Sequence, residues 1–263
     1  MADRWDVRTS DGGTIAVWID GDGPPLVLVH GSISDHTAFD PLVSELRSAF
    51  TVFAMDRRGF GASPDGAGYS GDREFSDVAM VVNAVGARTG ESVVLFGHSW
   101  GASCALVAAT RMPPLRALIL YEPSLGLQSP PGSLDRIEER LAAGDYEGAV
   151  IEVLESAGMT EDEIAERRAA PNWPDRVATA PTIAREGRIE EGWDWQPAQF
   201  ASLGVRTLFL TGSETTAELA EATSLIAAAV PGSRVHVFAG HGHVAHRSDP
   251  AAVADVLKDW LAD

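Results

Sequence analysis

Short apolar runs recur along the chain, separated by longer stretches that have helical potential. The runs occupy residues 26–29, 52–55, 93–96, 118–120, 207–210 and 235–238. Short runs rich in branched side chains are typical of parallel strands buried on both faces. The intervening stretches predict helices over residues 39–50, 75–89, 101–111, 216–230 and 251–261. This alternation predicts an α/β fold with a doubly wound, mostly parallel sheet.

The two remaining parts of the chain have different patterns. Apolar and polar residues alternate around an Asp-Gly-Gly turn at 11–13, which predicts an N-terminal β-hairpin. Residues 124–204 contain no convincing strand but show amphipathic spacing, and Thr160 with Glu163 matches a capping box. We therefore expect a single domain over residues 1–263, with residues 124–204 inserted as a helical lid.

Net charge and the distribution of apolar residues limit which binding partners and which cellular location we expect for the protein. The formal net charge is −18, so an anionic membrane or a nucleic acid would be repelled, and we expect neither as a partner. No apolar run is long enough to span a membrane, and the N-terminus has no signal segment, which favours a cytoplasmic protein. The single cysteine, Cys104, lies in an Ala-rich stretch and is expected to be buried. The sequence leaves a homodimer open.

A candidate nucleophile lies between the apolar run at residues 93–96 and the predicted helix at residues 101–111. Residues 97–101 read Gly-His-Ser-Trp-Gly, which is G-x-S-x-G in a strand-turn-helix context. Small residues two before and two after the serine allow the sharp turn that exposes its hydroxyl. Gly97 and Gly101 meet that requirement, so we predict that Ser99 is a nucleophile.

A serine hydroxyl needs a base, and His243 is the leading candidate. It follows the last predicted strand in a Gly-rich loop, at the edge where active sites of open α/β sheets gather. His241 and His246 are rivals in the same segment. The orienting carboxylate is either Glu122, after residues 118–120, or Glu214, after residues 207–210.

The oxyanion formed on acyl attack needs two N–H donors. We expect one from the backbone of Trp100, the residue after the nucleophile, and one from Ser32 in the loop after residues 26–29. We also expect His30, Gly31 and His98, which flank these positions, to contact substrate.

Several motifs in order resemble those of the α/β-hydrolase superfamily. They are His30-Gly31, the Asp56–Gly61 turn, the 97–101 motif, and Gly242-His243 with Pro250 beyond. The resemblance covers nearly the whole chain and implies an α/β-hydrolase fold, an acyl-enzyme mechanism and no cofactor or metal. It implies a mainly structural role for the Asp56–Gly61 turn.

The chain departs from the superfamily pattern at the acid. Members usually place an aspartate in a G-x-x-D turn after the penultimate strand, where this chain has Thr215. One type of haloalkane dehalogenase and zearalenone-type lactonases carry a glutamate after the preceding strand, and Tyr121-Glu122-Pro123 resembles that arrangement. The resemblance therefore favours Glu122 over Glu214. Ser99 stands where dehalogenases have an aspartate, which disfavours carbon–halogen displacement.

The predicted lid carries three tryptophans that could wall an apolar pocket over Ser99. They are Trp173, Trp193 and Trp195. No cluster of basic residues stands out in the sequence, so we expect a small apolar or aromatic ester or lactone as substrate. A carbon–carbon bond hydrolase and a cofactor-free perhydrolase would use the same serine and histidine. A non-catalytic small-molecule receptor is a further alternative on this fold.

Overall fold

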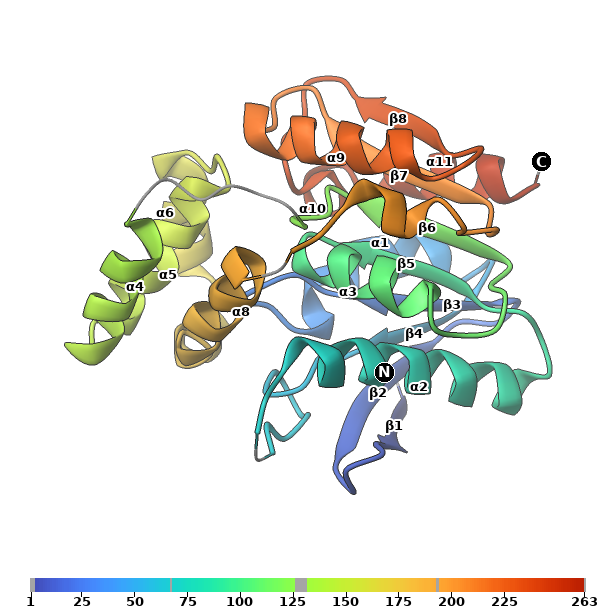
Figure 1. Cartoon of the computed structure of the whole chain (residues 1–263), viewed down its shortest axis with the longest axis horizontal. Helices are drawn as coiled ribbons and strands as arrows, with labels where there is room; N and C mark the ends of the chain where they lie inside the picture. Colours follow the sequence, from blue (N-terminus) through green and yellow to red (C-terminus); the bar gives the residue numbers. More distant parts are fainter. Residues whose placement is uncertain (1–2, 67, 126–131, 193, 263) are drawn as a thin grey trace.

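The computed structural model describes residues 3–66, 68–125, 132–192 and 194–262. Within these residues, eight strands form one sheet in the order β1-β2-β4-β3-β5-β6-β7-β8 (Figure 1). The strands are β1 (Asp3–Arg8), β2 (Thr14–Asp20), β3 (Pro25–Val29), β4 (Thr51–Met55), β5 (Val94–His98), β6 (Ala117–Tyr121), β7 (Thr207–Gly212) and β8 (Arg234–Phe238). Strands β3 to β8 are parallel, whereas β1 and β2 form the predicted antiparallel hairpin. The predicted fold class is confirmed.

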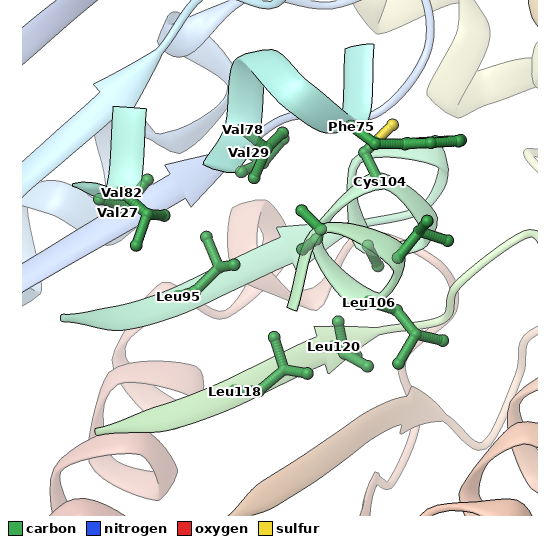
Figure 2. Packing of buried hydrophobic residues seen from close by; sticks show 14 of the residues in the cluster. Val27, Val29, Phe75, Val78, Val82, Leu95, Cys104, Leu106, Leu118 and Leu120 are labelled. Atoms are coloured by element: carbon green, nitrogen blue, oxygen red, sulfur yellow. The ribbon is translucent and has the colours of Figure 1, made fainter. Parts of the chain in front are cut away.

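Helices cover both faces of the sheet, as a doubly wound topology requires. One face packs against α2 (Gly71–Thr89), α3 (Trp100–Ala109) and α9 (Ala217–Ala229). The other packs against α1 (Asp40–Leu46) and α11 (Pro250–Ala262). Figure 2 shows the first of these cores, where side chains of β3, β5 and β6 meet those of α2 and α3. Cys104 is fully buried in it, as predicted.

Two predicted helices differ from the observed ones by four residues at one end. Helix α2 begins at Gly71 rather than at residue 75, because the side chain of Ser70 caps it by accepting from the Arg73 N–H. Helix α1 ends at Leu46 rather than at residue 50. The Arg47 carbonyl just beyond it accepts from the Asp22 N–H, which ties the end of the helix to the loop before β3.

A group of helices leaves the sheet between β6 and β7, and we call residues 133–192 the helical insertion (Figure 1). It comprises α4 (Ser133–Ala142), α5 (Tyr146–Ser156), α6 (Glu161–Ala169), α7 (Trp173–Ala178) and α8 (Pro181–Gly192). The predicted capping box of Thr160 and Glu163 opens α6. The insertion has a small apolar core of its own, which includes Val150 and Trp173. None of the helices in the described part of the chain is long and apolar enough to cross a membrane.

A fully buried carboxylate, Asp56, holds together the loops that follow β3 and β4. Its Oδ1 lies 2.7 Å from Nδ1 of His36 and accepts from the His36 N–H, while its Oδ2 accepts from Nε1 of Trp18 and from the Ala62 N–H, each at 2.9 Å. Burial works to raise the pKa of Asp56, but the hydrogen bonds from His36 and Ala62 outweigh it and hold the pKa at about 2.

We expect Asp56→Asn to lower the free energy of unfolding by about 2–4 kcal/mol at pH 7, because an amide nitrogen would face buried donors. The folded pKa of Asp56 lies below its unfolded value. Its contribution is therefore present above about pH 4 and is lost as the pH falls towards 2. Urea denaturation at pH 7 and pH 2.5 checks this, with Asp6→Asn, an exposed position, as the control. Equal stability of wild type and Asp56→Asn at pH 7 would contradict it.

Candidate active site

Ser99 lies between the end of β5 and the start of α3, in a conformation that non-glycine residues rarely adopt. Its backbone has φ 55° and ψ −127°. Two other non-glycine residues have positive φ in the described chain, Ile33 after β3 and Glu122 after β6. Such strained conformations cluster at functional sites, and all three lie beyond the carboxyl ends of neighbouring strands.

The tightness of this turn explains the glycines on either side of Ser99. A Cβ on Gly97 would lie 2.5 Å from Cα of Ala102, and one on Gly101 would lie 2.2 Å from the His30 carbonyl oxygen. Neither position can hold a side chain without moving the backbone. Gly31 is also confined, since a Cβ there would lie 2.9 Å from Cβ of Ser99.

His243 pairs with Glu122, the acid that the sequence favours. Nδ1 of His243 lies 2.5 Å from Oε2 of Glu122, and the Glu122 side chain is fully buried. An imidazole that donates from Nδ1 has Nε2 free to accept a proton, which is the tautomer that a general base needs. His243 and Ser99 line the same pocket.

Three donors besides His243 hold the Glu122 carboxylate. Oε1 accepts from the Thr211 hydroxyl and the Gly212 N–H, each at 2.8 Å, and Oε2 accepts from the Thr215 hydroxyl at 2.9 Å. Thr215 occupies the position where relatives usually carry the aspartate, so its hydroxyl here supports the displaced acid. Burial works to raise the pKa of Glu122, but hydrogen bonds and the charge of His243 outweigh it, and the pKa lies below its usual value.

The rival residues lie in other environments. Glu214 is exposed, and no hydrogen bond joins its side chain to His243 among the described residues. Nδ1 of His241 lies 3.1 Å from the Ser248 hydroxyl, and its Nε2 lies 3.6 Å from Oδ2 of Asp249. His246 is buried, and its Nδ1 has no hydrogen-bond partner in the described structure. Among these three histidines of the described chain, only His243 has a buried carboxylate within hydrogen-bond distance, because the Asp249 side chain near His241 is 43% exposed and its carboxylate is 3.6 Å away.

Two ring systems fix the loop that carries His243. Nε2 of His98 lies 2.8 Å from the His243 carbonyl oxygen, and the Tyr121 hydroxyl donates to the Gly242 carbonyl at 2.6 Å while accepting from the Ala245 N–H. His98 also lines the pocket, and its contact with substrate stays a prediction. The sequence assigns Tyr121 no role of its own, because an aromatic residue that ends a buried strand is usually part of the core.

The predicted oxyanion donors lie beside Ser99. Helix α3 begins at Trp100, so the Trp100 N–H is among the first-turn donors that have no carbonyl partner within the helix. Ser32 lines the pocket from the loop after β3. Nη1 of Arg176, in α7, donates to the Ile33 carbonyl at 3.1 Å and thereby connects this loop to the helical insertion.

A buried ion-pair network lies behind the same loop. Nη2 of Arg57 donates to the Gly31 carbonyl at 3.0 Å and to Glu186 of α8 at 2.8 Å, and its Nη1 pairs with Glu74 of α2. Glu74 also accepts from Nε1 of Trp100 at 2.9 Å. The network holds both candidate oxyanion segments and the helical insertion in one arrangement.

Four residues predicted as substrate contacts do not line the pocket that holds Ser99, namely His30, Gly31, Trp173 and Trp195. His30 is fully buried, with Nδ1 donating to the Gly31 carbonyl and Nε2 accepting from the Arg57 N–H, so it orders the loop instead. Trp173 packs in the core of the helical insertion and donates to Glu147. Trp195 packs against the apolar core that lies between the sheet and helices α2 and α3. Trp193 lies outside the described residues.

The pocket itself combines aliphatic and basic side chains. It has a volume of about 80 Å³ and is lined by Ser99, His243, Ser32 and aliphatic residues of the insertion such as Val153 and Leu154. Three arginines also line it, namely Arg167, Arg176 and Arg247. This cluster cannot be recognised from the sequence, because the three arginines are not neighbours in the chain. The pocket wall is therefore partly basic, whereas the sequence predicts an apolar one.

Comparison with known proteins settles the family. A model of the alpha/beta hydrolase family matches residues 26–256. The chain belongs to the alpha/beta hydrolase family. This hydrolase is 32% identical to an alpha/beta hydrolase from Sphaerobacter thermophilus, whose crystal structure matches with a TM-score of 0.84 over 97% of this chain and 99% of that chain.

Some of the curated relatives have named activities, and two of them follow. The hydrolase is 29% identical over 258 residues to a pimeloyl-(acyl-carrier protein) methyl ester esterase of Stenotrophomonas maltophilia, covering 93% of this chain and 95% of the relative. It is 33% identical over 134 residues to the 2-(acetamidomethylene)succinate hydrolase of Mesorhizobium japonicum, covering 50% of this chain and 46% of the relative. The predicted superfamily and the prediction of an enzyme are confirmed at the level of a hydrolase. Among the described residues, no cluster of His, Cys, Asp and Glu could hold a metal ion.

Proposed function

We propose that this hydrolase cleaves a carboxylic ester of a small molecule through an acyl-enzyme on Ser99. The observation that carries the proposal is the 2.5 Å contact between Glu122 and Nδ1 of His243, in a pocket that also exposes Ser99 at a strained turn. A relative that hydrolyses a methyl ester supports the reaction class.

In the first half-reaction, Nε2 of His243 takes the hydroxyl proton as the Ser99 oxygen attacks the ester carbonyl carbon. The N–H groups of Trp100 and Ser32 hold the oxyanion that forms. The bond to the alcohol oxygen then breaks, and the alcohol leaves with the proton carried by His243. In the second half-reaction, water attacks the acyl carbon and gives a proton to His243. The bond to the Ser99 oxygen then breaks, His243 returns the proton to that oxygen, and the acid leaves.

We also propose that the helical insertion acts as the lid of this site. Val153, Leu154 and Met159 from the insertion line the same pocket as Ser99. A lid with these side chains would exclude water from the acyl-enzyme until the leaving alcohol has departed.

Hydrolysis of p-nitrophenyl esters of increasing acyl length, together with a few aromatic lactones, tests the proposed reaction. We expect turnover of the shorter esters, because a cavity of about 80 Å³ has little room for a long acyl chain. The acyl length that is hydrolysed fastest then measures how long an acyl group the pocket accepts. The absence of turnover by well-folded protein for every ester and lactone would contradict the proposal and direct attention to carbon–carbon cleavage or ligand binding without chemistry.

A further inference from the structure

Three cationic side chains converge on the pocket that holds Ser99. Arg167 comes from α6, Arg176 from α7, and Arg247 from α10 (Ala245–Ser248), directly after the loop of His243. Arg176 is buried, and the other two are half-buried. In a chain with 38 acidic and 20 basic residues, such a gathering of positive charge requires a reason.

These arginines lack the carboxylate partners that other arginines of the chain have. Within the described residues, none of the three forms an ion pair within 4.0 Å, whereas Arg57, Arg58 and Arg188 form two or three each. Carboxylates act on the cluster only at longer range. They are Glu163 and Glu166 on Arg167, Asp35 on Arg176, and Asp35, Glu166 and Asp40 on Arg247. A buried cation without a partner is costly, so the cluster is suited to an anion brought by a ligand.

The electrostatics of the cluster agree with that view. Burial first, and then repulsion from Arg247 and Arg176, lowers the pKa of Arg167 to about 10. Burial and repulsion from Arg247 likewise lower the pKa of Arg176 to about 10. Each guanidinium thus raises the cost of the others, and a bound anion would remove that cost.

We propose that the ester substrate carries a carboxylate, which Arg167, Arg176 and Arg247 bind while Ser99 attacks the ester at the other end. This inference rests on the proposed function, since it assigns a substrate class to the same site. Aliphatic side chains of the same lining, such as Val153 and Met159, suit a short methylene chain or small ring between the two ends. Arg176 would also couple carboxylate binding to the oxyanion segment, because it already donates to the Ile33 carbonyl.

Matched pairs of substrates test the carboxylate directly. One pair is mono-p-nitrophenyl adipate and its methyl ester, which places the charge on the acyl side. The other pair is 4-acetoxybenzoate and methyl 4-acetoxybenzoate, which places it on the leaving group. For at least one pair we expect kcat/KM of wild type to favour the carboxylate form by about 10- to 100-fold, the range of a charge-assisted hydrogen bond. A preference for the neutral form in both pairs would overturn the inference.

Variants then assign the preference to the cluster. Arg167→Gln and Arg247→Gln should each lower the ratio of kcat/KM for charged over neutral substrate several-fold, whereas Arg167→Lys should lower it less. Arg168→Gln is the matched control, because Arg168 is exposed on the same helix and pairs with Glu147. An unchanged ratio in both Gln variants would overturn the inference. Thermal unfolding checks that each variant is folded.

A binding measurement separates this inference from the proposed reaction. Calorimetry with Ser99→Ala and free adipate should give binding that Arg167→Gln in the same background weakens by about tenfold or more. Adipate binding without hydrolysis of any ester would contradict the proposed reaction and leave the carboxylate site standing. Ester hydrolysis with no carboxylate preference and no adipate binding would contradict the carboxylate site and leave the proposed reaction standing.

Discussion

Ser99→Ala is expected to lower kcat for any ester that the hydrolase cleaves by about 10⁴- to 10⁶-fold. Removal of the hydroxyl removes the atom that forms the acyl-enzyme, and what survives is binding and the polarisation of the carbonyl by the N–H groups of Trp100 and Ser32. Initial rates with p-nitrophenyl butyrate at saturating concentration measure this. Substrate affinity should change little.

Ser103→Ala supplies the control for that experiment. Ser103 is buried on the same helix, its hydroxyl lies 3.4 Å from that of Ser124, and it does not line the pocket. We expect it to keep most of the wild-type activity. Ser99→Ala protein that retains more than about 1% of turnover would exclude Ser99 as the nucleophile.

Glu122→Gln is expected to lower kcat by about 10³- to 10⁴-fold, with the fold intact. An amide nitrogen facing Nδ1 of His243 would favour the wrong imidazole tautomer, which has a proton on Nε2 and cannot accept one from Ser99. The imidazolium that forms during attack would also lose its negative partner. Steady-state kinetics and circular dichroism of the variant measure the two effects separately.

Glu214→Gln is the matched control for the acid, because Glu214 was the alternative that the sequence left open. Its side chain is exposed, and we expect this variant to retain most of the activity. A large loss in Glu214→Gln with little loss in Glu122→Gln would move the acid to the turn after β7.

The parts of the fold that local pattern determines could be predicted from the sequence. Five of the six parallel strands appear as short apolar runs because both of their faces are buried, whereas the edge strand β8 exposes Val235 and Val237. The turn at Ser99 is marked by glycines whose places no side chain could take. The pairing of Glu122 with His243 was favoured by a resemblance rather than by periodicity. The hydroxyl of Thr215, which supports that acid, carried no signal in the sequence by itself.

The lining of the pocket could not be predicted, because it depends on how the helical insertion packs. Trp173 is as apolar as a pocket wall should be, yet its ring completes the insertion's own core. Arg167 and Arg176 look like ordinary surface residues of charged helices. Only the tertiary arrangement places them beside Arg247 and Ser99. Composition thus predicted an apolar pocket where the structure has a partly cationic one.

Covalent labelling tests the central claim most directly. Wild-type protein treated with a fluorophosphonate and digested with trypsin should carry one adduct, on Ser99, and Ser99→Ala should carry none. Glu122→Gln should label far more slowly than Glu214→Gln, because the same imidazole activates the serine. Folded wild-type protein that remains unlabelled, or that carries its adduct on another residue, would contradict the assignment of Ser99 as an activated nucleophile.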